Sequence, residues 1–149
     1  MNRIRMTACA LLLIALMIAP ASQAQQFEGF GNYEVHYNVL NSDQIPATVA
    51  QGYGIQRSAN RALLNITILD TSGETPTPIH ARVSASAVNL TGQRREIELR
   101  EISDSDDAVY YIGLLPVHNM ETYNFTVNVQ VEGEADPFVV SFRQQFFTE

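Results

Sequence analysis

Hydrophobic and polar residues alternate with a period of two along most of the chain after residue 30. The clearest example is residues 123–132, where every second residue is a tyrosine, a phenylalanine or a valine. This spacing puts the apolar side chains on one face of a β-strand and the polar ones on the other. Seven strands are predicted in this way, over residues 32–40, 61–70, 79–88, 94–102, 108–117, 123–132 and 138–147.

Two of these segments have patterns that place them within a sheet. Residues 61–70 are apolar on both faces towards their middle, which is typical of a central strand. Residues 94–102 alternate charges with Ile97 and Leu99, which indicates an edge strand or a strand with one solvated face.

The first long connection, residues 41–60, contains the only predicted helix. Pro46 suits the first turn of a short helix, and Gly52 or Gly54 suits its carboxyl end. The connection is long for a hairpin, so we expect it to cross from one sheet to the other or to cap one end of the fold.

Short polar connections and the lack of strand–helix–strand alternation predict an all-β protein. We expect an antiparallel, immunoglobulin-like β-sandwich of about seven strands, with a small barrel as the alternative. The inter-sheet disulfide of immunoglobulins is excluded, because Cys9 is the only cysteine.

The amino-terminal residues predict export. Arg3 and Arg5 precede an apolar run over residues 8–19, and small residues surround Ala24. This is the pattern of a secretory signal peptide over residues 1–24, cleaved after Ala24. We therefore expect a single periplasmic domain, residues 25–149, without a membrane span after signal removal.

The charge balance excludes some classes of partner. All sixteen acidic residues follow position 24, against seven arginines and no lysine, which gives the domain a net charge of −9. Nucleic acids and anionic lipids are therefore not expected partners. Neither a nucleophile motif nor a clustered set of histidines appears, so the sequence predicts no enzymatic activity and implies no cofactor.

The segment QGYGIQRSANRALLN, residues 51–65, is the strongest candidate for a binding site. Tyr53 lies between two glycines, Arg57 and Arg61 are two of few cations, and Ser58 and Asn60 add neutral donors. Two converging guanidinium groups bind carboxylate or phosphate well. The structural alternative is that the arginines pair with nearby acids and that Tyr53 plugs the end of the sandwich.

A weaker candidate is the acidic loop SDSDDA. Asp104, Asp106 and Asp107 offer the hard oxygen ligands that calcium prefers. The loop lacks the glycine and the terminal glutamate of an EF-hand, so a solvated acidic turn is the alternative.

One block resembles a known family. Tyr53, Gly54, Ile55, Arg57 and Ser58, with YEVHYNVLNS before them and DAVYYI after, are similar to a family of small exported proteins of Gram-negative bacteria. That family is known only as a domain of unknown function. The resemblance covers nearly the whole mature chain and implies a periplasmic β domain without an assigned activity.

These observations favour a non-enzymatic binding or protein-interaction module of the periplasm. Its partner is expected to be an envelope protein or an anionic ligand. Binding would use the Tyr53–Arg61 loop or an exposed strand edge, above all that of the C-terminal strand. A calcium- or other metal-stabilised accessory domain that uses residues 104–107 is the alternative.

Overall fold

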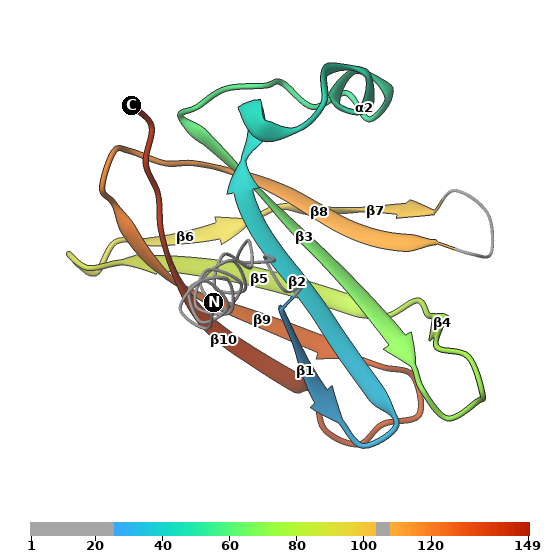
Figure 1. Ribbon diagram of the computed structural model, residues 1–149. Coiled ribbons are helices and arrows are strands. Elements are labelled where there is room, and N and C mark those ends of the chain that lie inside the picture. Colours follow the sequence, from blue (N-terminus) through green and yellow to red (C-terminus); the bar gives the residue numbers. More distant parts are fainter. Residues whose placement is uncertain (1–25, 104–107) are drawn as a thin grey trace, which may run out of the picture.

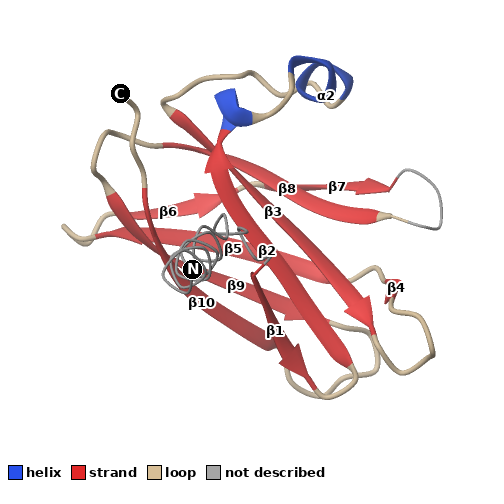
Figure 2. Cartoon of the chain, in the orientation of Figure 1, coloured by secondary structure: helices blue, strands red, loops and turns tan. Residues whose placement is uncertain are grey.

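The computed structural model describes residues 26–103 and 108–149, which form ten strands and two short helices (Figure 1). The elements are β1 (Gln26–Phe30), β2 (Tyr33–Asn41), the 3-10 helix η1 (Ser42–Gln44), α2 (Ala47–Gly52), β3 (Arg61–Asp70), β4 (Thr77–Pro78), β5 (Arg82–Asn89), β6 (Arg94–Ile97), β7 (Leu99–Ser103), β8 (Val109–Pro116), β9 (Thr122–Gln130) and β10 (Phe138–Gln145). Strands dominate the described chain, as Figure 2 shows.

The strands form two antiparallel sheets. The first, sheet A, has the order β1-β2-β3-β8-β7, with β4 paired to β3; the second, sheet B, has the order β10-β9-β5-β6. The orders β2-β3-β8-β7 and β10-β9-β5-β6 correspond to the ABED and GFCC′ sheets of immunoglobulin domains. The predicted immunoglobulin-like sandwich is therefore confirmed, and β1 adds a hairpin strand at one edge.

The main core lies between the sheets. Alternate residues of β3 and β9 supply much of it, and their inward side chains are almost completely buried. Phe125 stacks on Phe142 with ring centroids 4.8 Å apart and meets Phe146 edge-on at 6.2 Å. In immunoglobulin domains the strand-F cysteine lies two residues after a tyrosine, and Phe125 has that place after Tyr123 on β9. Phe125 thus has the place of that cysteine, and Tyr37 of sheet A stacks on Phe142 of sheet B with ring centroids 4.5 Å apart, so aromatic packing joins the two sheets.

The expected strand over residues 94–102 is wrong as a single element. It divides at Glu98 into β6, at the edge of sheet B, and β7, at the edge of sheet A. The alternation of charged and apolar residues continues through the division, so the sequence pattern does not reveal it. The expectation that the segment has an edge position is confirmed in both sheets.

Gly113 on β8 makes room for this change of sheet. It lies opposite Leu99 in the β7–β8 ladder. A methyl group at Gly113 would lie 2.5 Å from Ile97 Cγ2, 2.9 Å from the Glu98 carbonyl oxygen and 2.9 Å from Leu99 Cδ2. Only glycine therefore fits beneath the division between β6 and β7.

The long connection over residues 41–60 does not cross between sheets, because β2 and β3 are neighbours in sheet A. It instead folds over the end of sheet A, and Figure 1 shows α2 above the strands at that end. The expected short helix is confirmed. The connection covers the outer face of sheet A, the face turned away from sheet B.

Candidate functional site

The connection packs against the outer face of sheet A through a second, smaller hydrophobic cluster. Its buried members are Ile45, Ala50, Ile55, Leu63 and Ile112, and Leu40, Tyr53 and Ile102 pack beside them. We call this set the outer cluster. It joins α2 and its flanking loops to strands β3, β7 and β8, so the connection has a defined position on the sheet.

The carboxyl end of α2 determines how the loop returns to the sheet. Gly54 has a φ of +64°, a conformation that glycine adopts readily. The Gly54 N–H donates to the Gln51 carbonyl and the Ile55 N–H to the Ala50 carbonyl. This is a Schellman motif, in which Ile55 and Ala50 make the accompanying hydrophobic contact. Gly54, and not Gly52, is therefore the terminating glycine.

An apolar cleft of about 320 Å³ lies between the connection and the outer face of sheet A. Its lining residues are Ile45, Val49, Tyr53, Ile55, Leu63, Asn65, Ile102, Tyr110 and Ile112. Val49 and Tyr110 are 43% and 38% exposed, so apolar surface continues from the cleft to solvent. Ligand pockets typically combine such an apolar lining with a few polar groups.

Asn65 is the one amide side chain in this lining. Its Oδ1 is buried, and no donor of the described residues lies within hydrogen-bond distance of it. A buried acceptor without a partner destabilises a protein by roughly 1–3 kcal/mol. A donor in the cleft could reach this oxygen only after rotation of the amide, and that rotation would sacrifice no hydrogen bond at Oδ1.

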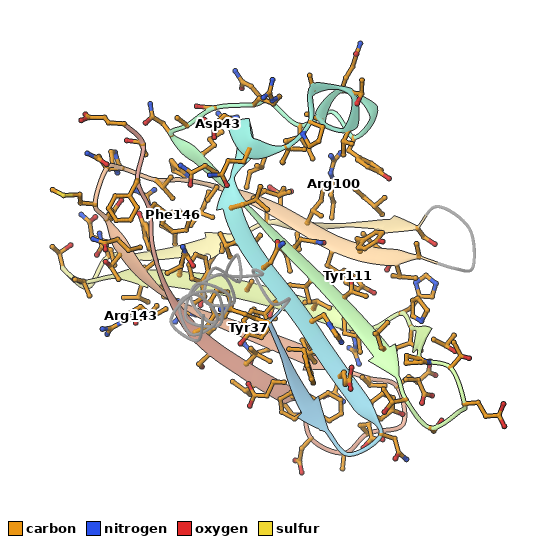
Figure 3. The ribbon with its side chains drawn as sticks, viewed as in Figure 1. Tyr37, Asp43, Arg100, Tyr111, Arg143 and Phe146 are labelled. Carbon is orange, nitrogen blue, oxygen red and sulfur yellow. The ribbon has the colours of Figure 1, made fainter. Side chains whose placement is uncertain are left out.

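Arg100 of β7 fixes the rim of the cleft. Its guanidinium group donates to the Tyr53 carbonyl at the carboxyl end of α2. Figure 3 shows Arg100 reaching from the strands toward α2. The hydrogen bond holds the helix end over the sheet, and the contact is between residues 47 positions apart in sequence.

The structure places one of the five predicted site residues in the cleft. Tyr53 is half-buried in the outer cluster and lines the cleft. It neither projects freely nor plugs the space between the sheets. The other four predicted residues, Arg57, Ser58, Asn60 and Arg61, do not line the cleft.

Arg57 and Arg61 both extend into solvent. Arg57 Nη2 donates to the Asp43 carbonyl oxygen at 2.6 Å, and Arg61 Nη1 donates to Gln56 Oε1 at 3.0 Å. Within the described ranges neither guanidinium group forms an ion pair with an acid. The expected pairing with nearby acids is thus not seen there, and anion binding by the two arginines stays a prediction.

Ser42 fixes the loop that carries these arginines. It is fully buried, and its Oγ accepts a hydrogen bond from the Ser58 N–H at 2.9 Å. The same hydroxyl lies within donating distance of the Gln56 and Ser58 carbonyl oxygens, at 3.0 and 3.1 Å. Asn60 continues the loop, with its N–H donating to Ser58 Oγ at 3.2 Å.

We expect Ser42→Ala to lower the free energy of unfolding by about 1–3 kcal/mol, because it leaves buried backbone groups without a partner. Arg57→Ala is the matched control on the same loop, and its exposed side chain predicts a change within about 0.5 kcal/mol. Urea denaturation of both variants checks the pair. Equal losses would show that Ser42 is not the anchor of the loop.

The acidic loop, the weaker candidate site of the sequence, is not among the described residues. Asp104, Asp106 and Asp107 lie outside the described residues. Elsewhere in the described chain, no group of three or more histidine, cysteine or acidic residues is placed to hold a metal ion. Calcium binding at residues 104–107 therefore stays a prediction, which a calcium-dependent rise in melting temperature would test.

Each of the three histidines contacts a glutamate. The pairs are His36–Glu34, His80–Glu101 and His118–Glu121, at 2.8, 2.8 and 2.9 Å. Phe27 stacks on His36, which therefore is more covered than a solvated strand residue would be. None of the three histidines lines the cleft.

The Glu121 carboxylate is predicted to make the stability of the fold depend on pH in the acidic range. Burial raises its pKa, but hydrogen bonds from Asn89 and His118 outweigh burial and hold the pKa below its ordinary value of 4.5. A lowered folded-state pKa contributes stability above the unfolded value, and this contribution is lost as the pH falls through the folded value.

We therefore expect Glu121→Gln to reduce the acid sensitivity of unfolding below about pH 4.5. The stability of wild type should fall more steeply with decreasing pH than that of the variant. Glu74→Gln, on an exposed loop, is the control and should follow wild type. Identical acid profiles for Glu121→Gln and wild type would contradict the assignment.

Sequence reasoning missed Asn65, Ile102 and Tyr110 as cleft residues. A signal for Asn65 was present, because it is a single amide in the middle of a strand that is otherwise apolar on both faces. Nothing in the sequence indicates that residues of β7 and β8 lie beneath the connection, since that depends on the strand order.

Fold and cleft together define a small immunoglobulin-like β-sandwich protein with one short helix over the outer face of a sheet. The chain belongs to the family described as Domain of unknown function (DUF4426), whose model matches residues 27–149. The predicted resemblance to a domain of unknown function is thereby confirmed.

The match extends to solved structures. A crystal structure of a DUF4426 family protein from Pseudomonas aeruginosa PAO1 is similar to this chain, with 33% sequence identity and a TM-score of 0.70. The similarity covers 84% of this chain and 96% of the other. No curated protein matches the chain. In the described residues, no helix has both the length and the apolar character that crossing a membrane requires.

Proposed function

We propose that the protein is a non-enzymatic binding module of the periplasm and that the cleft is its binding site. The proposed occupant is a small apolar group that carries one hydrogen-bond donor. The periplasmic location in this proposal rests on the predicted signal peptide over residues 1–24. The observation that carries the site is the buried Asn65 Oδ1 without a described donor in an otherwise largely apolar lining.

The size and polarity of the cleft support this occupant. A volume of about 320 Å³ is at the lower end of the range for ligand pockets and suits one large side chain or one small ring system. The lining residues include no acid and no arginine. The occupant is therefore expected to be uncharged, since a buried charge needs a partner.

The hydrogen bond gives the site its selectivity. An apolar group gains affinity from surface removed from water, whereas a donor gains it only where an acceptor is reachable. In the low-dielectric cleft a hydrogen bond to Asn65 Oδ1 is stronger than it would be in water. A ligand with a donor should therefore bind more tightly than one of the same shape without it.

Two fluorescent probes test this proposal. N-phenyl-1-naphthylamine has one N–H donor, and 1-benzylnaphthalene has a methylene group in place of the N–H and therefore a similar shape without the donor. We expect wild type to bind the amine roughly 2–10-fold more tightly, the range that one neutral hydrogen bond provides. Asn65→Leu should bind both probes equally, because it keeps the apolar lining and removes the acceptor.

A second substitution tests the location. Val49→Arg puts a charge at the exposed rim of the cleft and should weaken binding of both probes. Val139→Arg is the matched control, because Val139 is similarly exposed, at 46%, but lies on β10 of sheet B. Binding that Val49→Arg leaves unchanged, or that wild type lacks altogether, would contradict the proposal.

A further inference from the structure

A second concave region lies between an edge of sheet A and an edge of sheet B. Its lining residues are distant in sequence from the cleft residues of β7 and β8. It has a volume of about 670 Å³. Its lining residues are Gln26, Asn38, Val39, Leu40, Asn41, Gln44, Gln144, Gln145, Phe146 and Phe147. We call it the edge groove. One wall is the end of β2 and the other is the end of β10 with the residues that follow it.

The β2 wall is a strand edge that has no partner strand within residues 26–103 and 108–149. The β1–β2 ladder starts at Gln26, which pairs with Tyr37. On its other side, β2 continues to pair with β3 as far as Asn41. Residues 38–41 thus have a strand partner on one side only among the described residues. Such an edge presents backbone N–H and C=O groups that another strand can pair with.

The opposite wall is held in place by hydrogen bonds. Asn41 Nδ2 donates to the Phe147 carbonyl at 2.7 Å and to the Ala59 carbonyl at 3.0 Å. The Phe146 N–H donates to the Glu121 carbonyl at 2.9 Å. Figure 3 shows Phe146 on the C-terminal segment, beyond the end of β10. The groove is therefore formed before any partner arrives.

The lining favours an uncharged, hydrogen-bonding occupant. Six of the ten lining residues are asparagine or glutamine, and none is charged, although the domain has a net charge of −9. Amide side chains both donate and accept hydrogen bonds. A polypeptide backbone needs the same combination, and the open edge of β2 supplies it in the spacing of a strand.

We propose that the edge groove binds an extended, uncharged segment of a partner protein by β-strand addition. The added strand pairs with Asn38–Asn41 and continues the line of β1 within sheet A. The C-terminal residues Gln144–Phe147 cover its other side. Signal cleavage after Ala24 would leave only Gln25 ahead of β1, too little chain to pair with all four positions.

Main-chain pairing gives affinity in this mode of recognition, and pockets for alternate side chains give specificity. Tyr37 and Val39 of β2 pack against the main core, so alternate residues of the added strand point inward as well. An occupant with small β-branched residues at the inward positions fits this geometry. Four paired residues span about 14 Å.

A tethered strand tests the proposal. Val-Thr-Val is inserted between Ala24 and Gln25 of the full chain, and the exported, processed protein is purified. Extending the observed register places the three inserted residues opposite Val39, Leu40 and Asn41. Val-Thr-Pro at the same place is the control, because its proline, opposite Val39, has no N–H to donate and the residue after the cleavage site stays valine.

Hydrogen exchange measures the outcome. We expect those amides of residues 38–41 whose N–H groups point away from β3 to exchange at least tenfold more slowly with Val-Thr-Val than with Val-Thr-Pro or in the unextended protein. Equal exchange in the three proteins would overturn the proposal. If these amides exchange slowly in the unextended protein and faster after dilution, the occupant is a second copy of this chain, and the proposal is overturned. If maltohexaose slows the exchange of these amides in the unextended protein, the groove is a glycan site, and the proposal is overturned.

Discussion

Replacing Phe125 by alanine is expected to lower the free energy of unfolding by about 3–5 kcal/mol, the largest effect of any substitution considered. The side chain is 1% exposed and packs against both Phe142 and Phe146. Its removal leaves a cavity between the sheets, and the loss includes aromatic contacts beyond the buried area. Urea denaturation, followed by far-ultraviolet circular dichroism, measures the change.

This expectation follows from the cysteine content. With Cys9 as the only cysteine, no disulfide within the domain can join the sheets, so packing alone must do so. Phe147→Ala is the control, because that ring is 60% exposed. It should change stability by less than about 0.5 kcal/mol. A loss below 1 kcal/mol in Phe125→Ala would show that the aromatic group does not hold the sandwich together.

Gly113→Ala should lower the free energy of unfolding by about 2–3 kcal/mol. The added methyl group would meet the Glu98 carbonyl oxygen at 2.9 Å, and a backbone atom moves less readily than the end of a side chain. Relief of this steric overlap requires a shift of the segment that passes from β6 to β7. Differential scanning calorimetry should show a lower melting temperature.

The matched control is Gly29→Ala on β1. A methyl group there meets nothing within 4 Å, and Gly29 is not among the glycines with positive φ. We expect this variant to melt within a few degrees of wild type. Equal melting temperatures for Gly113→Ala and wild type would mean that β8 and the β6–β7 segment are not packed as described.

The period-two pattern is sufficient to predict most of the strands. The bounds of β3 agree with the prediction at both ends, and the inward residues of β9 are buried as expected. The pattern does not predict two features of the fold, the division at Glu98 and the strand β4. The division at Glu98 preserves the alternation, and β4 is only two residues long. Both depend on contacts with β8 and β3 that a local pattern does not encode.

The candidate site was predicted only in part. Local sequence predicts the connection, its helix and two candidate glycines for the end of that helix, and it predicts Tyr53 as a candidate binding residue. It did not reveal that Tyr53 faces the strands β7 and β8, because their place beside β3 follows from the order of the whole sheet. Apolar residues on both faces of residues 61–70 predict a central strand, whereas Leu63, on the outer face of β3, belongs to the outer cluster.

The most direct test of the cleft as a binding site is to identify the residues that a bound probe contacts. We would measure nuclear Overhauser effects between N-phenyl-1-naphthylamine and the isotope-labelled protein. We expect contacts from the probe to Ile102, Tyr110 and Ile112, together with a shift of the Asn65 side-chain amide signals. Contacts confined to the edge groove, or the absence of contacts at saturating probe, would contradict the proposed binding site.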